Sequence, residues 1–140
     1  MTKAFQGIRV IDLSDRLSGA YAARMFGDFG ADVILIEDGE GHPLRHEPPF
    51  INGDSSLHGY VNWNKRSVSG TAEDHRSLIA GADVIVTTST QIPDTVLQRS
   101  PDSVHLSITP HGLEGPLADF PGNNLTTCAR VGWSAINRYV

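Results

Sequence analysis

The sequence lacks the features that mark several large classes of protein. It has one cysteine, Cys128, so no internal disulfide can form. No apolar run approaches the roughly 20 residues that a membrane-spanning helix needs, and the first residues lack the apolar stretch of a signal peptide. The 11 Lys and Arg residues are scattered and the net charge is -5, which disfavours the basic face that nucleic-acid binding requires. We therefore expect a cytoplasmic protein that binds neither nucleic acid nor membrane.

Common catalytic and cofactor-binding motifs are also missing. The sequence contains no Gly-x-x-x-x-Gly-Lys-Ser/Thr phosphate loop and no Gly-x-Ser-x-Gly elbow of a hydrolase. It has no His-Glu-x-x-His, and His42 and His46 flank a proline although their spacing of four fits a helix. We therefore expect no metal site.

The order of apolar and turn-forming segments predicts an α/β fold. At 39% hydrophobic and 19% charged residues, the 140-residue chain has the composition of a folded protein, and no linker divides it, so we expect a single domain over 1–140. Short apolar runs predict strands, and apolar residues at spacings of three and four predict helices. The expected elements are strands at 8–13, 33–36, 84–86 and 104–108, with helices at 18–29, 74–80, 93–99 and 125–136.

Alternation of strands and helices predicts a Rossmann-like, mostly parallel sheet with flanking helices. Two stretches rich in Gly and Pro interrupt the alternation, from Gly39 to Leu57 and from Thr109 to Asn124, and we expect both to be loops.

The loop after the first expected strand is a candidate anion-binding site. In a parallel sheet, ligands bind beyond the carboxyl ends of the strands, where a helix amino terminus offers free N–H groups. Gly19 would permit close backbone approach and Arg16 would add a positive charge. An ordinary turn, with Ser18 as the cap of the following helix, explains the same residues.

A nicotinamide-dinucleotide site is an alternative, because Glu37 ends the second expected strand, where an acidic residue would hold a ribose hydroxyl. The glycine fingerprint of that class is absent from the loop, where only Gly19 is present.

Several collinear stretches together resemble the family III CoA-transferases, the group that includes formyl-CoA transferase, the carnitine CoA-transferases and the α-methylacyl-CoA racemases. They are GIRVIDLSDRLSGAYAARMFGDFGADVILIE, GHPLR, NWNKRSVSG, ADVIV and LSITPHGLEGPLADFPGNNLTTCARVGW. The resemblance covers most of the chain and corresponds to the amino-terminal portion of the family.

This resemblance implies a function and a way of association. It implies a domain that binds the nucleotide end of coenzyme A, acyl-CoA and carboxylic acid substrates, and interlocked subunits, so we expect a homo-oligomer. The family's chemistry uses an aspartate that forms mixed anhydride and thioester intermediates. Family members are much longer, which implies that the chain is a fragment, a split subunit or one end of a larger polypeptide, completed by the remainder of the family fold or by a second subunit.

The resemblance also assigns residues. Leu17, Ser18 and Gly19, beside Arg16, correspond to the family's contacts with CoA or the acyl group. Thr88 and Ser89 correspond to its contacts with the nucleotide. Lys65 and Arg66 match the family's Asn-Lys-Arg motif, where ligand contact and anchoring of a strand are both compatible with the sequence. No residue of the chain matches the catalytic aspartate, which we expect beyond Val140.

Some positions depart from the family pattern. Asp38 stands where members commonly have an arginine or a proline, and a carboxylate there would repel phosphate. Thr88-Ser89-Thr90 replaces an Asn-Phe-Arg/Gly type of sequence, and Asn123 replaces the catalytic histidine of the racemases. A non-catalytic or degenerate CoA-binding half of a larger fused transferase is therefore the alternative reading.

Overall fold

The structure is a computed structural model that describes residues 3–136. The chain divides into two compact units, Met1–Ile108 and Thr109–Val140. The division falls at the start of the turn-rich loop, a position that the sequence does not mark as a domain boundary.

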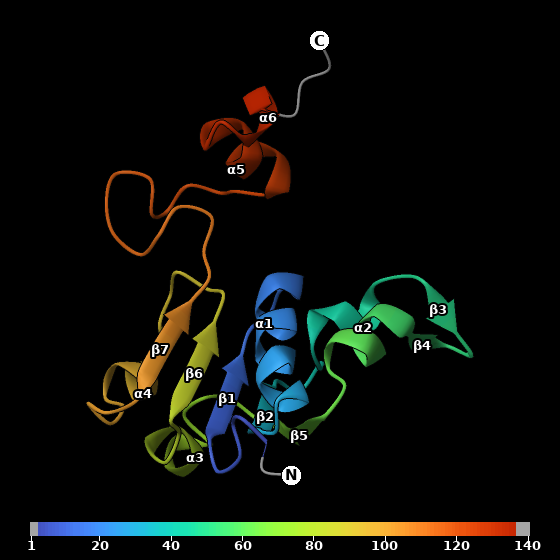
Figure 1. The fold of residues 1–140 in the computed structure, drawn as a ribbon, viewed down its shortest axis with the longest axis vertical. Coiled ribbons are helices and arrows are strands. Elements are labelled where there is room, and N and C mark those ends of the chain that lie inside the picture. The colour runs from blue at the N-terminus through green and yellow to red at the C-terminus, as the bar shows by residue number, and fades with distance from the viewer. Residues whose placement is uncertain (1–2, 137–140) are drawn as a thin grey trace. The chain divides into compact units, whose positions relative to one another are not determined.

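The first unit has the alternating order of strands and helices that the sequence predicts (Figure 1). Its elements in chain order are β1 (Arg9–Leu13), α1 (Leu17–Asp28), β2 (Asp32–Glu37), the 3-10 helix η1 (Pro43–His46), β3 (Phe50–Ile51), β4 (Asp54–Ser55), α2 (Ser56–Val61), β5 (Lys65–Ser69), α3 (Arg76–Ala80), β6 (Val84–Thr87), α4 (Asp94–Leu97) and β7 (Val104–Ser107).

Five of these strands form one sheet in the order β5-β2-β1-β6-β7, and every neighbouring pair is parallel. The predicted α/β class with a parallel sheet is therefore confirmed. The strand order reverses between β1 and β6, because the chain first builds outward through β2 and β5 and then returns to the other side of β1. In open α/β sheets this reversal is the point where ligands bind.

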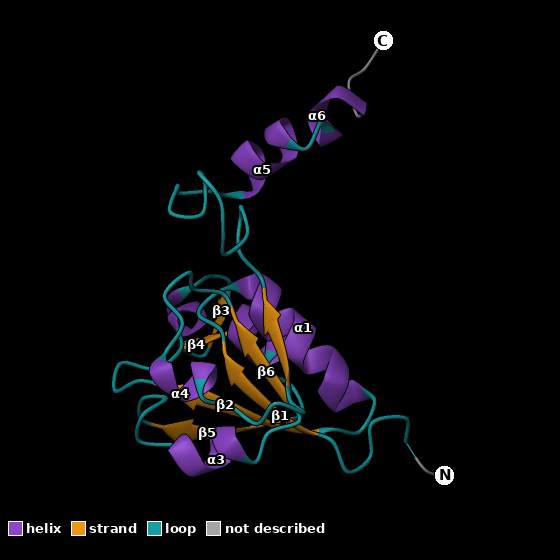
Figure 2. Ribbon diagram, turned by 90° about the vertical axis from the view of Figure 1, so that its left-hand side faces the viewer, coloured by secondary structure: helices purple, strands orange, loops and turns teal. Residues whose placement is uncertain are grey.

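Helices cover both faces of the sheet, with α1 on one side and α3 and α4 on the other (Figure 2). Successive strand residues point to opposite faces, so the strands are apolar on both. The α1 face packs Val10, Ala23, Val33 and Val86, and the other face packs Ile11, Ile34, Ile36, Ile79, Ile85 and Val96. The helices of this unit therefore cover both faces of the inner strands.

Strand β5 was missing from the sequence prediction. It is an edge strand, and Arg66, Ser67 and Ser69 are exposed, so it lacks the apolar run that marks the inner strands. The sequence of β5 therefore has no apolar run from which a strand could be predicted.

The predicted long loop at 39–57 is wrong in part, because it contains η1, the hairpin β3–β4 and the start of α2. These elements have only two to six residues each. Such short elements show no sustained period in a sequence.

The second unit contains α5 (Asn124–Arg130) and α6 (Trp133–Ile136), where the sequence predicted one helix. Gly132 separates them with a positive φ of 78°. Asn123 caps α5 by accepting a hydrogen bond from the Thr126 N–H at 3.1 Å. Trp133 and Ile136 are 62% and 81% exposed. Among the described residues, no helix is long and apolar enough to cross a membrane.

Candidate functional site

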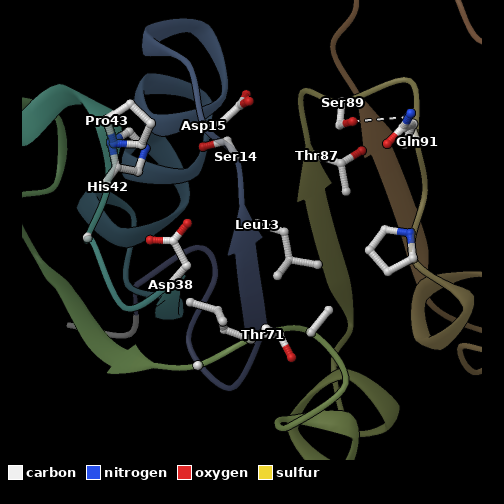
Figure 3. Close-up of a pocket in the computed structure, with 15 residues that line it drawn as sticks. Leu13, Ser14, Asp15, Asp38, His42, Pro43, Thr71, Thr87, Ser89 and Gln91 are labelled. Carbon is white, nitrogen blue, oxygen red and sulfur yellow. Dashed lines mark hydrogen bonds between the residues drawn. The ribbon is translucent and has the colours of Figure 1, made fainter.

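A cleft of about 410 Å³ lies at the carboxyl edge of the sheet, where the strand order reverses. Residues that end or follow β1, β2, β5 and β6 line it (Figure 3). They include Leu13, Ser14, Asp15, Asp38, His42, Thr71, Thr87 and Ser89. The cleft is the place where a parallel sheet is expected to bind a ligand.

The amino terminus of α1 lies beside this cleft, because α1 follows the end of β1 after only three residues. Its N-cap is Arg16, and no side chain caps it. The prediction that Ser18 is the cap is wrong: Ser18 lies inside the first turn, and the Arg16 carbonyl accepts from the Ala20 N–H at 3.0 Å. The first N–H groups of α1 are therefore left to other acceptors, and they are the groups that a phosphate can use.

The loops after β1 and β6 are in direct contact. The Asp15 N–H donates to Thr88 Oγ1 at 2.9 Å, and the Thr88 hydroxyl donates to the Asp15 carboxylate at 2.5 Å. The structure thus brings together the two loops that the sequence analysis singled out. The Thr88 hydroxyl is engaged by Asp15, whereas Ser89 lines the cleft.

Gly19 allows α1 to pack tightly against both loops. A Cβ at this position would clash with the Ser14 side chain and lie 2.6 Å from Thr88 Cγ2. Gly19 lies in the first turn of α1 and does not have a positive φ. The glycine is therefore required because there is no space for a side chain, and not because of its backbone conformation. Its observed role is to let α1 pack closely, whereas the sequence suggested that it lets the backbone approach a ligand.

Arg16 and Asp15 carry opposite charges at the edge of the cleft. Arg16 Nε lies 3.8 Å from the Asp15 carboxylate, and both side chains are more than half exposed. Such exposed pairs contribute little energy. The Arg16 guanidinium is thus held loosely beside the amino terminus of α1.

Two buried polar atoms in the cleft lining have no hydrogen-bond partner, Ser14 Oγ and His42 Nε2. Ser14 is 4% and His42 3% exposed. The Leu44 N–H donates to His42 Nδ1 at 3.1 Å, so the neutral imidazole carries its hydrogen on Nε2. Burial lowers the pKa of His42, which favours this neutral form.

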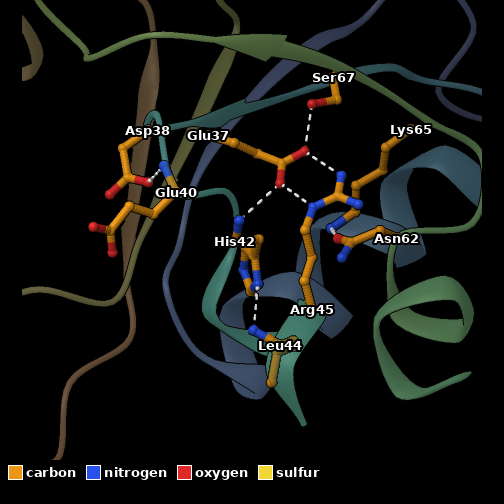
Figure 4. Close-up of polar contacts among 9 residues, drawn as sticks. All are labelled: Glu37, Asp38, Glu40, His42, Leu44, Arg45, Asn62, Lys65 and Ser67. Atoms are coloured by element: carbon orange, nitrogen blue, oxygen red, sulfur yellow. Dashed lines mark hydrogen bonds and ion pairs between the residues drawn. The ribbon is translucent and has the colours of Figure 1, made fainter. Parts of the chain in front are cut away.

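Beneath the cleft, the Glu37 carboxylate is fully engaged within the protein (Figure 4). Arg45 donates to both of its oxygens at 2.6 and 2.8 Å, and the His42 N–H and the Ser67 hydroxyl also donate to it. The hydrogen bonds from Arg45 hold the pKa of Glu37 at about 2, against the opposing effect of burial. Glu37 therefore has no oxygen left for a ribose hydroxyl, which removes the feature that favoured the nicotinamide alternative.

Lys65 is buried under the first turn of α1 and does not line the cleft. Its ammonium group donates to Asp12 Oδ2 at 2.7 Å, to the Ala20 carbonyl at 2.8 Å and to Asn62 Oδ1 at 2.7 Å. The Lys65 side chain is 1% exposed, and burial lowers its pKa. These three acceptors use the three donors of an ammonium group, so the contacts anchor β5 to β1 and α1.

Arg66 points to the other side of β5 and is exposed. Its guanidinium pairs with the Asp32 carboxylate at 2.6 Å, at the amino end of β2. The structure therefore does not bring Lys65 and Arg66 to the cleft edge with Arg16, Thr88 and Ser89.

His42 and Asp38 line the cleft although the sequence did not predict either as a site residue; Asp38 stood out only as a departure from the family pattern. Both follow β2: His42 falls in the stretch from Gly39 to Leu57 that was predicted to be a loop, and Asp38 directly precedes that stretch. The signal for His42 was Pro43, since a proline at the first position of a helix places the preceding residue at the cap. No group of three or more possible metal-ligating side chains occurs within residues 3–136.

Comparison with known proteins gives one family. The sequence model of CoA-transferase family III matches residues 5–138. The chain is 33% identical over 152 aligned residues to the succinyl-CoA:(R)-benzylsuccinate CoA-transferase subunit BbsE of Thauera aromatica, covering 95% of this chain and 37% of that protein. It is 31% identical to the succinyl-CoA:glutarate CoA-transferase of Mus musculus, covering 93% of this chain and 34% of that protein. The chain thus spans about a third of the length of these relatives.

Solved structures show the same fold. A CAIB/BAIF family protein from Brucella suis superimposes with a TM-score of 0.81 at 24% identity, covering 94% of this chain and 40% of that one. The protein Rv3272 from M. tuberculosis superimposes with a TM-score of 0.80 at 25% identity, covering 99% of this chain and 43% of that one. The fold of this chain therefore corresponds to part of the fold of these larger proteins.

Proposed function

Because the chain belongs to CoA-transferase family III, we propose that it is the CoA-binding part of an acyl-CoA:carboxylate CoA-transferase. The nucleotide portion of CoA binds along the carboxyl edge of the sheet, at the amino terminus of α1 and in the adjoining cleft. The observation that carries this proposal is the uncapped first turn of α1, which lies beside the cleft at the carboxyl edge of the sheet.

Each residue at the edge has a distinct part. The N–H groups of Leu17, Ser18 and Gly19 face a phosphate, and the helix dipole adds a partial positive charge there. Arg16 supplies a full positive charge from a flexible, exposed side chain. Ser89, in the loop after β6, contacts the ligand from the opposite wall of the cleft.

The chemistry of transfer belongs to an aspartate outside these 140 residues. That carboxylate attacks the acyl-CoA thioester, and the resulting anhydride is opened by the CoA thiolate to give an enzyme thioester and free acid. The residues described here bind and orient the nucleotide end, and none of them performs the covalent step. An assay of acyl exchange between CoA thioesters and free acids should therefore detect no turnover by the isolated chain, and turnover would contradict this assignment.

Calorimetric titration of the purified chain with CoA tests the binding itself. Arg16→Ala should weaken CoA binding by about 1 to 3 kcal/mol, the range for a charge-assisted hydrogen bond to phosphate. Arg9→Ala is the matched control, because it removes an arginine of similar exposure, 45% against 56%, from the opposite, amino end of β1. Equal affinities of the two variants would show that Arg16 is only a surface charge.

Association with further polypeptide is part of the same proposal. Four large apolar side chains follow one another at intervals of four residues along α1 and its C-cap, and each is at least 40% exposed: Leu17, Tyr21, Met25 and Phe29. Exposed apolar surface of this kind usually finds a partner. We expect a homo-oligomer or a complex with the remainder of the family fold, in the cytoplasm. A monodisperse monomer with cooperative unfolding in light scattering and denaturation would contradict it.

The alternative is a non-catalytic or degenerate half of a larger fused transferase. The negative charges at the cleft, Asp15 and Asp38, favour this alternative, because carboxylates weaken the binding of a phosphorylated ligand. Absence of CoA binding in the titration would support it.

A further inference from the structure

A buried ion pair lies beside the loop that joins β1 to α1. Asp12, in β1, is fully buried, and the Lys65 side chain, from β5, is 1% exposed. The Lys65 ammonium donates to Asp12 Oδ2 at 2.7 Å, although β2 lies between β1 and β5 in the sheet. The Lys65 side chain therefore reaches across β2, on the face of the sheet that α1 covers.

The same ion pair holds the backbone of this loop. Asp12 Oδ1, the carboxylate oxygen that Lys65 does not use, accepts from the Ser14 N–H at 3.0 Å. The next amide, the Asp15 N–H, donates to Thr88 Oγ1 at 2.9 Å. Two consecutive amides of the loop are thus held by side chains of the protein, at the point where the chain leaves β1 and enters α1.

Lys65 also holds the first turn of α1. Its ammonium donates to the Ala20 carbonyl at 2.8 Å and to Asn62 Oδ1, at the C-cap of α2, at 2.7 Å (Figure 4). The first hydrogen bond within α1 runs from the Ala20 N–H to the Arg16 carbonyl, so the amides from Leu17 to Gly19 precede it. Those are the amides that a phosphate can use. One ammonium group therefore sets the end of β1 against the start of α1.

Stability alone does not account for a buried ion pair at this place. Burial of two charges costs desolvation energy, and apolar side chains of similar volume are often as stabilising. An ammonium group provides direction in addition, because its three hydrogen bonds fix where β1, α1 and α2 lie relative to one another. A site that is held in its binding geometry before the ligand arrives loses less free energy when it binds.

We propose that Lys65 is a positioning residue for the nucleotide ligand. Through Asp12 and the Ala20 carbonyl, it presets the loop after β1, so that the amino terminus of α1 is already arranged to accept a phosphate of CoA. Lys65 does not contact the ligand, because its three donors are used within the protein and it does not line the cleft. This inference rests on the proposed binding of CoA at this edge, and it adds a residue that acts from beneath the site.

Calorimetric titration of the double variant Asp12→Asn/Lys65→Met with CoA tests the inference. The variant removes both charges, so neither is left buried alone, and asparagine keeps an acceptor for the Ser14 N–H. CoA affinity should fall about tenfold if the binding arrangement is then populated about one tenth of the time. The matched control is Asp32→Asn/Arg66→Met, which makes the same changes in an exposed ion pair between β2 and β5. It should leave the affinity within about twofold, because exposed pairs contribute little.

Amide hydrogen exchange separates positioning from a general effect on stability. In the unmodified protein, the Ser14 amide should be protected without CoA and gain less than about twofold when CoA binds, whereas the amides from Leu17 to Gly19 should gain protection. In Asp12→Asn/Lys65→Met, exchange at Ser14 should be about tenfold faster relative to the central amide of Ile85, since the loop opens locally. Circular dichroism of the variant should match that of the unmodified protein.

Three results would overturn the inference and leave the proposed function intact. They are an unchanged CoA affinity in the folded double variant, a loss of protection that is uniform across the sheet, and a Ser14 amide that becomes protected only when CoA binds. The last is measured on the unmodified protein, so it decides the question even if the double variant does not fold. If the unmodified protein does not bind CoA, the proposed function fails and the inference fails with it.

Discussion

Two neighbouring regions at the carboxyl edge of the sheet use the same kinds of side chain in opposite ways. Beneath the cleft, Asp12 pairs with Lys65 and Glu37 with Arg45, and three of these four side chains are at most 5% exposed. At the cleft edge, Asp15 and Arg16 are more than half exposed, and Asp38 is also exposed. The buried charges hold strands and helices together, while the exposed charges remain open to a ligand. The degree of burial therefore separates the charges that hold the fold together from those that are exposed at the cleft edge.

The largest expected effect comes from breaking the buried pair. Lys65→Met leaves the fully buried Asp12 carboxylate without its cation, and we expect a loss of about 3 to 5 kcal/mol in the free energy of unfolding. Chemical denaturation followed by circular dichroism measures it. Arg66→Ala, next to it on β5, removes an exposed pair with Asp32 and should cost at most about 1 kcal/mol. Similar losses in the two variants would contradict the distinction between buried and exposed charges.

Acid should weaken the second buried pair. Glu37 has a pKa of about 2 in the folded protein and an ordinary value of 4.5, so its stabilisation is complete above pH 4.5 and is lost as the pH falls toward 2. The shift corresponds to about 3 kcal/mol. Unfolding free energies measured between pH 5 and pH 2 should show this slope, and Glu37→Gln should reduce it. Glu40→Gln, at an exposed site in the same segment, should retain it.

Overpacking where α1 meets the loops after β1 and β6 should have a smaller effect on the free energy of unfolding. Gly19→Ala places a methyl group against the side chains of Ser14 and Thr88, and we expect a loss of about 1 to 3 kcal/mol. Gly59→Ala is the control, because Gly59 lies inside α2 with open space around its Cα, and alanine there should stabilise the protein by about 0.5 to 1 kcal/mol. Thermal denaturation of both variants provides the test. If Gly19→Ala leaves the stability unchanged, the loops after β1 and β6 can move apart to accept the methyl group.

The smallest expected effect on stability comes from two histidines, His42 and His58. Burial lowers the pKa of both His42 and His58, whose ring centroids lie 5.7 Å apart. Below pH 6.5 the unfolded chain therefore binds more protons at these two residues than the folded protein does. Stability should therefore decline as the pH falls through 6.5. Replacing both by non-titrating residues, His42→Asn to keep a capping acceptor and His58→Gln, should flatten this decline. An unchanged pH dependence in the double variant would assign the slope to other groups.

Much of the fold followed from the sequence because its inner strands are short, continuous apolar runs. Val10, Ile11, Val33, Ile34 and Ile85 are buried on both faces of the sheet and mark three strands without ambiguity. The edge strand β5 escaped detection because its exposed residues carry no such run.

Part of the candidate site also followed from the sequence. The loops at Arg16 to Gly19 and at Thr88 and Ser89 each come after a strand that the sequence predicts, and parallel strands bring such loops to one edge. Sequence position alone did not reveal that Thr88 is engaged by Asp15, or that Lys65 is buried, because both depend on contacts between residues more than 40 positions apart.

By itself, the sequence determined the α/β class, the parallel sheet and the resemblance to CoA-transferase family III, since apolar periodicity and family motifs are local properties of the chain. Only the tertiary structure decided which charged residues serve the fold and which face the cleft. Glu37 and Asp38 are adjacent in the sequence, yet one is closed off by Arg45 and the other lines the cleft. Successive residues at the end of a strand point to opposite sides, so the partners that pack around each side chain determine its role.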